Sequence, residues 1–228
     1  MRNLLAIETA TEACSAALWV DGKIIERYEI APRQHARRIL DMIDEVLAEA
    51  GVVKSQLDAI AFGRGPGAFT GLRIAAGVAQ GIAFGLDLPV APVSTLAALA
   101  QSVDHGRYSQ VLAVLDARMQ QVYAGAYGVG DDGLVELQGT ETVVDAEDMD
   151  LPEGDSWFGV GSGWKEYGLV IQERMNSRLA GFDADRFPRA ESIARLGAKM
   201  LAAGQGVAPE QALPVYLRDQ VADRSAKV

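Results

Sequence analysis

The segment GRGPGAFTGLR, residues 63–73, brings together residue types that can bind a phosphate group. Its four glycines stand where a predicted strand passes into a predicted helix: Gly63, Gly65, Gly67 and Gly71. Glycine permits positive φ angles and close approach of another group, and the free N–H groups at a helix start attract anions. The segment therefore predicts a phosphate loop, and the alternative is a tight turn whose glycines only allow close packing.

Arg118 is a second candidate for phosphate binding. It follows the predicted strand 111–115, and loops at strand ends are where ligands gather. Its planar guanidinium can bind a phosphate or a carboxylate, although a local pair with Asp116 is an equally good alternative. The residues expected to contact a phosphate or nucleotide are Gly65, Gly67, Thr70, Gly71 and Arg118.

Two well-known nucleotide motifs fit this loop poorly. It is not a Walker A loop, because no Lys-Ser/Thr pair follows the last glycine. Gly63-x-Gly65-x-x-Ala68 formally matches the dinucleotide fingerprint, but Asp87 precedes the next strand instead of ending it, and Pro66 lies within the turn. A Rossmann fold is therefore disfavoured.

Other catalytic groups are scarce. His35 and His105 are the only histidines, and neither has a histidine four residues away with which to hold a metal on a helix. Cys14 lies on a predicted strand without a nearby base, and Gly161-Ser162-Gly163 lacks the spacing of a nucleophile elbow. We therefore expect no catalytic residue, no metal site and no peptidase activity.

The order of predicted elements indicates an α/β protein with two lobes, residues 1–105 and 106–228. Asp21-Gly22 predicts a hairpin turn, and apolar residues at three- and four-residue spacing predict an amphipathic helix that ends near Gly51. No internal repeat is visible. Strands are expected at 3–31 (three in succession), 57–62, 89–93, 111–115, 121–129, 134–143 and 156–161, and helices at 32–50, 74–85, 95–102 and 190–203.

The second helix is rich in glycine and alanine. Each glycine inside a helix costs about 1 kcal/mol relative to alanine, so the glycines must be offset by close approach of a neighbour. That neighbour is either another subunit or the sheet of the same chain. For the first alternative, the expected interface residues are His35, Ile39, Met42, Ile43, Val46, Leu72, Ala76, Ala79 and Ala83.

Composition narrows the function classes. The 228 residues carry 21 Lys and Arg against 31 Asp and Glu, a net charge of −10, which argues against a free-standing nucleic-acid binder. Ten of the acids lie between Met119 and Trp164, where there is no Lys or Arg. A single cysteine and the lack of an apolar leader or span predict a soluble, cytoplasmic protein.

Four segments resemble the bacterial TsaB (YeaZ) family: LAIETATEACSAAL, GRGPGAFTGLRIAAGVAQGIAFG, VLAVLDARMQQVYAGAY and PVYLRDQVA. The resemblance implies an α/β fold of the two-lobed sugar kinase–Hsp70–actin (ASKHA) type with a reduced second lobe. It also implies a non-catalytic subunit required for threonylcarbamoyl transfer to the adenosine next to the anticodon, in tRNAs reading codons that begin with A. Such subunits form a heterodimer with the catalytic subunit TsaD, work with the ATPase TsaE, and also self-associate as homodimers.

The resemblance carries further implications for sites and partners. The family's subunit contact uses two helices that match residues 33–50 and 72–85, and TsaD-type catalysts hold a metal with a helical His pair, whereas Ile39 follows His35 here. No intrinsic cofactor is expected, and ATP or ADP bound at the heterodimer interface is a weaker alternative. The chain is expected to contact tRNA only through the complex and to have no membrane role. The rival function is a small-molecule kinase or ATPase of the same fold that uses the 63–71 loop, with Glu8 or Asp116 as magnesium ligand or base.

Overall fold

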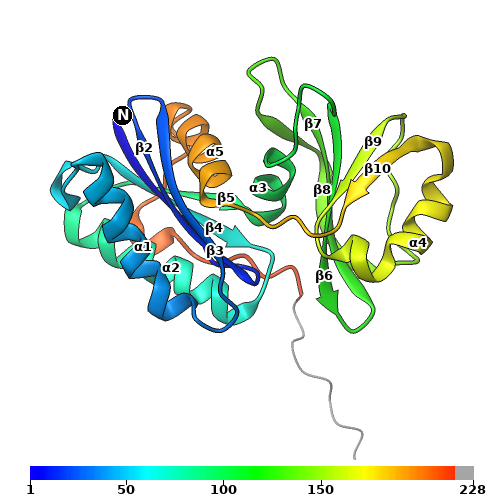
Figure 1. The fold of residues 1–228 in the computed structure, drawn as a ribbon, viewed down its shortest axis with the longest axis horizontal. Coiled ribbons are helices and arrows are strands. Elements are labelled where there is room, and N and C mark those ends of the chain that lie inside the picture. The colour runs from blue at the N-terminus through cyan, green and yellow to red at the C-terminus, as the bar shows by residue number, and fades with distance from the viewer. Residues whose placement is uncertain (219–228) are drawn as a thin grey trace, which may run out of the picture.

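The computed structural model describes residues 1–218 and shows two lobes, each built on a five-stranded sheet (Figure 1). The first part of the chain contains β1 (Asn3–Glu8), β2 (Ala13–Val20), β3 (Lys23–Ile30), α1 (His35–Ala50), η1 (Lys54–Gln56), β4 (Ala59–Gly65), α2 (Phe69–Leu86), β5 (Val90–Ser94) and α3 (Thr95–Gln101). The second contains β6 (Gln110–Arg118), β7 (Gln121–Val129), β8 (Val135–Asp145), β9 (Trp157–Val160), α4 (Gly163–Met175), η2 (Asn176–Arg178), β10 (Leu179–Asp183), α5 (Ala190–Ala202) and η3 (Pro209–Gln211).

The two sheets have the same topology. Their strand orders are β3-β2-β1-β4-β5 and β8-β7-β6-β9-β10. In each, three antiparallel strands are followed by two strands parallel to the first. The second lobe is reduced, because residues 146–156 replace the helix that α1 provides between β3 and β4. The predicted two-lobed ASKHA-type α/β fold is confirmed, and its repeat is topological although the sequence shows none.

Local sequence explains where several elements begin and end. Asp21 and Gly22 turn the β2–β3 hairpin with φ of 47° and 87°. Gly51 ends α1 in the left-handed region, and the Ser94 hydroxyl caps α3 by accepting a hydrogen bond from the Ala97 N–H at 3.2 Å. The sequence did not predict helix α4 or strand β10. For α4 the reason is that its apolar stripe is weak.

The helices and sheets form five layers (Figure 1). Helices α1 and α2 cover the outer face of the first sheet, α5 and α3 lie between the sheets, and α4 covers the outer face of the second. Alternation along β1 serves both faces, because Leu5 and Ile7 point toward α1 and α2 while Leu4 and Ala6 join the core between the sheets.

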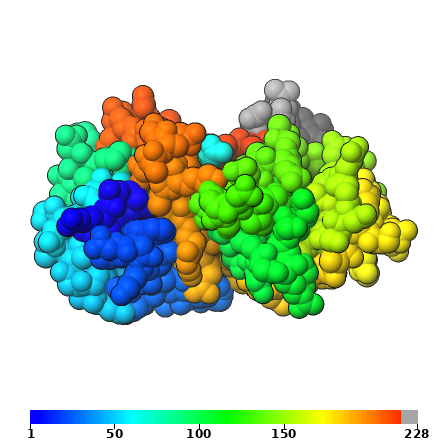
Figure 2. All heavy atoms as spheres, turned by 90° about the horizontal axis from the view of Figure 1, so that it is seen from above, coloured from blue at the N-terminus to red at the C-terminus, as the bar shows by residue number. Residues whose placement is uncertain are grey.

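Helix α5 packs in the first lobe, although the sequence assigned all of 106–228 to the second. It lies against β1, β2, β4 and β5, and Figure 2 shows this segment between the two lobes. Its first N–H groups are capped by the first sheet, since Ala190 N–H donates to Ser15 Oγ (2.9 Å) and Glu191 N–H donates to Glu26 Oε1 (3.0 Å). After α5 the chain pairs Val207 with Val90 beside β5, so residues 190–212 complete the first lobe.

Polar contacts tie the lobes together across this shared core. Glu141 on β8 accepts hydrogen bonds from the Tyr127 hydroxyl (2.5 Å) and from the hydroxyl of Ser94 in the first lobe. Lys199 on α5 reaches the acidic β7–β8 hairpin, with Asp132 at 2.9 Å and Glu136 at 2.8 Å. Part of the acidic excess therefore has a structural role between the lobes.

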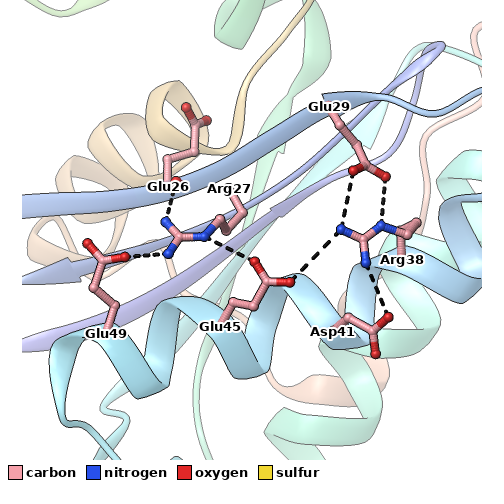
Figure 3. A network of polar contacts seen from close by, with 7 residues as sticks. All are labelled: Glu26, Arg27, Glu29, Arg38, Asp41, Glu45 and Glu49. Atoms are coloured by element: carbon pink, nitrogen blue, oxygen red, sulfur yellow. Dashed lines mark hydrogen bonds and ion pairs between the residues drawn. The ribbon is translucent and has the colours of Figure 1, made fainter.

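An ion-pair network fastens α1 to the edge strand β3 (Figure 3). The Arg38 guanidinium donates to both carboxylate oxygens of Glu29, at 2.8 and 3.2 Å, and Arg27 contacts Glu45 at 3.1 Å and Glu49. Single exposed pairs contribute little, but these charges share partners along one flank of α1. That flank of α1 therefore binds β3 of the same chain and is not free for a partner.

The contact of α5 with the first sheet predicts a large cost for one substitution. A Cβ at Gly197 would lie 2.7 Å from Ala61 Cβ, so Gly197→Val should push α5 away and lower the free energy of unfolding by about 1–3 kcal/mol. Urea denaturation measures the change. The matched control is Gly77→Val on α2, where a Cβ meets no atom within 4 Å and stability should change by less than about 0.5 kcal/mol. Equal losses in both variants would contradict this account.

Candidate functional site

A cleft of about 1120 Å³ opens between the two lobes. The first lobe contributes the β1–β2 loop, the start of α1 and the loop that leads into α2, and the second contributes the β6–β7 turn and the start of α4. The C-terminal residues 215–218 also line it. The cleft thus collects segments from both ends of the chain.

The glycine-rich loop borders this cleft, but most of its glycines are explained by packing. Gly67, Thr70 and Gly71 line the cleft, whereas Gly65 does not. A Cβ at Gly71 would lie 2.0 Å from Thr9 O, and one at Gly63 would lie 2.0 Å from Glu8 Oε2. The loop therefore presses directly on the end of β1, and close packing is a sufficient reason for these glycines.

Helix α2 begins at the cleft without a side-chain cap. Ala68 is its N-cap residue and makes no side-chain hydrogen bond, and Ala68, Phe69 and Thr70 line the cleft. The first turn of any helix has N–H groups without intrahelical partners, which favour anions. The expected contacts Gly67, Thr70 and Gly71 thus lie beside a helix start, and Gly65 lies behind them.

Arg118 forms the local pair that the sequence left open. Its guanidinium lies 3.0 Å from Asp116 Oδ2, and its backbone N–H donates to Asp116 Oδ1 at 2.8 Å. The Arg118 side chain is 79% exposed and lines the cleft, while Asp116 is only 12% exposed. The fold therefore brings Arg118 to the same cleft as the glycine-rich loop. The Asp116 carboxylate already neutralises the charge of the Arg118 guanidinium.

The charges that line the cleft balance. Lys165 lies 3.4 Å from Asp185, as Arg118 lies beside Asp116. A cleft that concentrates phosphates needs an excess of cations, and the lining residues that the structure describes supply no such excess. The four cationic and four carboxylate side chains of the lining are Arg33, Arg118, Lys165 and Arg218, and Glu12, Asp116, Glu166 and Asp185.

Glu8 is sealed beneath the loop and does not line the cleft. Its Oε1 accepts a hydrogen bond from Ala10 N–H at 2.6 Å, and its Oε2 has no partner. Burial raises the pKa of the Glu8 carboxyl from 4.5 to about 7, against the lowering effect of hydrogen bonds from the Ala10 and Thr9 backbone. In this position Glu8 cannot reach a ligand in the cleft.

Apart from Arg118, the residues of the second wall of the cleft were missed from the sequence. Ser162 and Lys165 line it from the start of α4, and Tyr216 and Arg218 line it from the C-terminal segment. One signal was available, since Ser162 lies between glycines. A Cβ at Gly163 would meet Val114 Cγ1 at 2.5 Å, so this turn presses on β6 as the 63–71 loop presses on β1.

The other reactive side chains are largely buried, although His35 borders the cleft. His35 is buried, and its Nε2 lies 3.2 Å from Ala13 O. Burial raises the pKa of the Cys14 thiol to about 12, and the neighbouring Glu29 carboxylate adds to this. Among residues 1–218 no group of three or more His, Cys, Asp or Glu side chains is placed to hold a metal ion.

The nine expected interface residues are buried within the chain, so their assignment to a surface is wrong. Ile39, Met42, Ile43 and Val46 on α1 pack with Ala79 and its neighbours in the core over the outer face of the first sheet. The physical reason is that the apolar stripes of both helices cover this sheet. Because these side chains are buried, charged substitutions at these positions would test folding and not partner binding. The remaining residues of the set, His35, Leu72, Ala76 and Ala83, are buried as well.

The opposite face of α2 is exposed and has an unusual composition. Gly77, Gly81 and Gly85 follow one another at one-turn spacing, and a Cβ on any of them would meet no atom within 4 Å. Phe84 on this face is 79% exposed. Packing within the chain therefore explains the buried alanines of α2 but not its exposed glycines.

Helix α2 is also long and apolar enough to cross a membrane, with a mean hydropathy of 1.3 over Phe69–Leu86. Its buried side chains, including Leu72, Ala75 and Ala79, pack on the first sheet. Much of this hydropathy comes from Ile74, Val78, Ile82 and Leu86, which are partly buried against the core that the helix covers.

The buried carboxyl predicts a pH dependence of stability. The pKa of Glu8 is higher in the folded than in the unfolded chain, so its stabilising contribution is complete below about pH 4.5 and is lost as pH rises through about 7. Between pH 5 and pH 8 the parent should therefore lose roughly 2–3 kcal/mol of unfolding free energy that Glu8→Gln, which has no carboxyl at this position, keeps. Urea denaturation at both pH values measures it, with Glu12→Gln on the same loop as control. A difference that is the same at both pH values would show that Glu8 does not ionise in this range.

Comparison with known sequences shows full-length relatives. A family model described as "TsaD: tRNA N6-adenosine threonylcarbamoyltransferase" matches residues 25–226. The tRNA threonylcarbamoyladenosine biosynthesis protein TsaB of Escherichia coli K12 is 41% identical, with 96% of each chain covered. TsaB of Haemophilus influenzae is 40% identical, over 96% of this chain and 94% of that protein.

Comparison with solved structures agrees. YeaZ from Pseudomonas aeruginosa is 49% identical and superimposes with a TM-score of 0.88, covering 95% of this chain and 100% of that one. A second structure, described as an uncharacterized protein from Pseudomonas aeruginosa with similarity to peptidase YEAZ, gives a TM-score of 0.89 at the same identity, covering 96% and 100%. With the duplicated topology and the closely packed glycine loop, these matches show that the chain belongs to the TsaB (YeaZ) family of tRNA threonylcarbamoyladenosine biosynthesis proteins.

Proposed function

We propose that this chain is the non-catalytic partner of a TsaD-like subunit in threonylcarbamoyl transfer to the adenosine next to the anticodon. The tRNAs concerned read codons that begin with A, and a TsaE-like ATPase completes the system. Family membership supports this role. The observation that most supports this role is the exposed face of α2. Its glycines and Phe84 suit contact with a partner, and packing among the described residues does not explain them.

The exposed glycines of α2 fit a close helix–helix contact. Each costs about 1 kcal/mol relative to alanine in a helix interior, and none of the residues 1–218 lies against them. A partner helix that approaches their backbone would offset this cost by packing. Phe84 lies two turns from Gly77 on the same flank and supplies a large apolar side chain to such a contact.

Helix α1 contributes its free flank. The flank with Arg38 and Glu45 is tied to β3 by the network of Figure 3. Leu40 lies two residues from Arg38, hence on the opposite flank at about 3.6 residues per turn, and is 53% exposed. The proposed docking face therefore consists of Leu40, Gly77, Gly81, Phe84 and Gly85, and it would serve a second copy of this chain in a homodimer as well.

The charges of the chain suit an indirect role with tRNA. The net charge is −10, and the exposed edge strand β8 and residues 146–156 carry much of the acidic excess. Phosphate-dominated binding needs clustered cations, so the partner subunit is expected to supply the tRNA contacts. We place the complex in the cytoplasm and assign no membrane role to the chain.

The rival function, a small-molecule kinase or ATPase, is less well supported. Glu8 is sealed away from the cleft, and Asp116 is paired with Arg118. The charge balance of the cleft gives no preference for a nucleotide. We therefore propose that this chain holds no cofactor of its own, and that ATP or ADP, where the complex binds it, lies at the heterodimer interface.

The docking face is tested by Phe84→Asp. The substitution places a charge in the apolar centre of the proposed contact, so the affinity for the TsaD-like subunit should fall at least tenfold, about 1.4 kcal/mol. Isothermal titration calorimetry or co-elution in size-exclusion chromatography measures the loss. Because Phe84 is exposed, the melting temperature of the isolated variant should stay within about 2 °C of the parent.

Leu169→Asp on α4 is the matched control, since Leu169 is 80% exposed but lies on the other lobe. This variant should bind the partner as the parent does. Normal binding by Phe84→Asp, or equal loss in both variants, would reject the exposed face of α2 as the docking surface.

A further inference from the structure

The exposed side of α2 runs from the proposed docking face into the interlobe cleft. Thr70, Gly77 and Phe84 follow one another at seven-residue spacing, which is about two helical turns, so they point in the same direction. All three are exposed. Thr70 also lines the cleft, in the first turn of the helix. One uninterrupted side of α2 therefore carries both the docking face and a residue of the cleft wall.

Helix α1 repeats this arrangement beside α2. The two helices lie side by side on the outer face of the first sheet (Figure 1). Ala36 lies about one turn before Leu40, both are exposed, and Ala36 lines the cleft together with Arg33. We call the exposed cleft residues Arg33, Ala36 and Thr70 the lip. Two neighbouring helices therefore lead from the docking face to the same lip.

A partner contact of ordinary size reaches the lip. A stable interface buries about 800 Å² on each partner, which corresponds to a patch of about 16 Å in radius. Thr70 lies about 14 Å along the axis of α2 from the midpoint of Gly77 and Gly81, and Ala36 lies about 6 Å from Leu40, at about 1.5 Å per residue. A contact centred on the glycines of α2 therefore extends over the lip.

The composition of the two regions fits the anatomy of such a contact. Interfaces have an apolar interior and a polar edge that remains partly wet. The docking face supplies glycines and the exposed apolar side chains of Leu40 and Phe84. The lip supplies Thr70 and Arg33, which are polar. The edge of the partner contact and the edge of the cleft are therefore formed by the same residues.

We propose that the TsaD-like subunit, seated on α1 and α2, extends over the lip and borders the interlobe cleft. The cleft is then bounded by three bodies in the heterodimer, which are the two lobes of this chain and the partner. The partner that fits has an apolar surface against the docking face and a polar segment against the lip. This inference rests on the proposed function, because it takes Leu40, Gly77, Gly81, Phe84 and Gly85 as the docking face.

Protection of thiols by the partner tests the inference. Thr70→Cys and Ala36→Cys place one reporter on each helix at the lip, and both are small changes at exposed positions. The native Cys14 is buried and adds little background. With the TsaD-like subunit at about a hundred times its Kd, about 1% of the chain is free, so maleimide should label both reporters at least tenfold more slowly. The intact mass of this chain reports the labelling, so thiols of the partner do not contribute.

Two further reporters make the outcome specific. Leu40→Cys lies within the docking face and should be protected, whereas Gln172→Cys on α4 is exposed on the other lobe and should react at its free rate. Protection of Leu40→Cys with normal labelling of both lip reporters would overturn the inference and leave the docking face standing. Normal labelling of Leu40→Cys and of both lip reporters would reject the docking face and the inference together. Equal slowing of Gln172→Cys would assign the effect to a general action of the partner, and would also overturn the inference.

Discussion

The burial of α3 and α5 between the two sheets is the constraint on which the rest of the structure depends. Leu99 of α3 and Ile193 of α5 share one apolar core with residues of both sheets, including Leu4 and Val111. Helix α5 packs on the first sheet and against α3, and α3 packs against strands of both sheets, so the two lobes share one core. Polar ties through Glu141 and Lys199 join the two lobes beside this core, and the cleft lies between the same two lobes.

Two surfaces result, and they suit different tasks. The cleft has balanced charges and a floor in which glycines allow backbone contact, with Glu8 enclosed and bearing a raised pKa. The outer face of α2 instead leaves Phe84 and three glycines in solvent, at a cost in helix stability that a partner would offset. An ASKHA-type chain can thus retain the architecture of its fold while its exposed chemistry favours association.

Periodicity identified α1, α2, α3 and α5 but not α4, and it did not show which surfaces pack against these helices. The apolar stripe of α1 and the alanines of α2 were visible in the sequence, yet a stripe that packs on a sheet and one that packs on a subunit have the same spacing. Ile43 and Ala79 are therefore buried where a surface was expected, and the exposed stripe lies on the other side of α2. The duplicated topology was equally hidden, because strand order arises from pairing between segments far apart in the sequence.

The sequence by itself determined the local elements and the family. Asp21-Gly22, Gly51 and Ser94 fix a turn, a helix end and a cap through their own backbone and side-chain chemistry, and the GRGPGAFTGLR segment marks a strand-to-helix junction. Only the tertiary structure decided what those glycines touch, that Glu8 is enclosed, that α5 belongs to the first lobe and that residues 215–218 line the cleft. These properties depend on distances between residues separated by much of the chain, and such distances are set by how the layers pack rather than by any local preference.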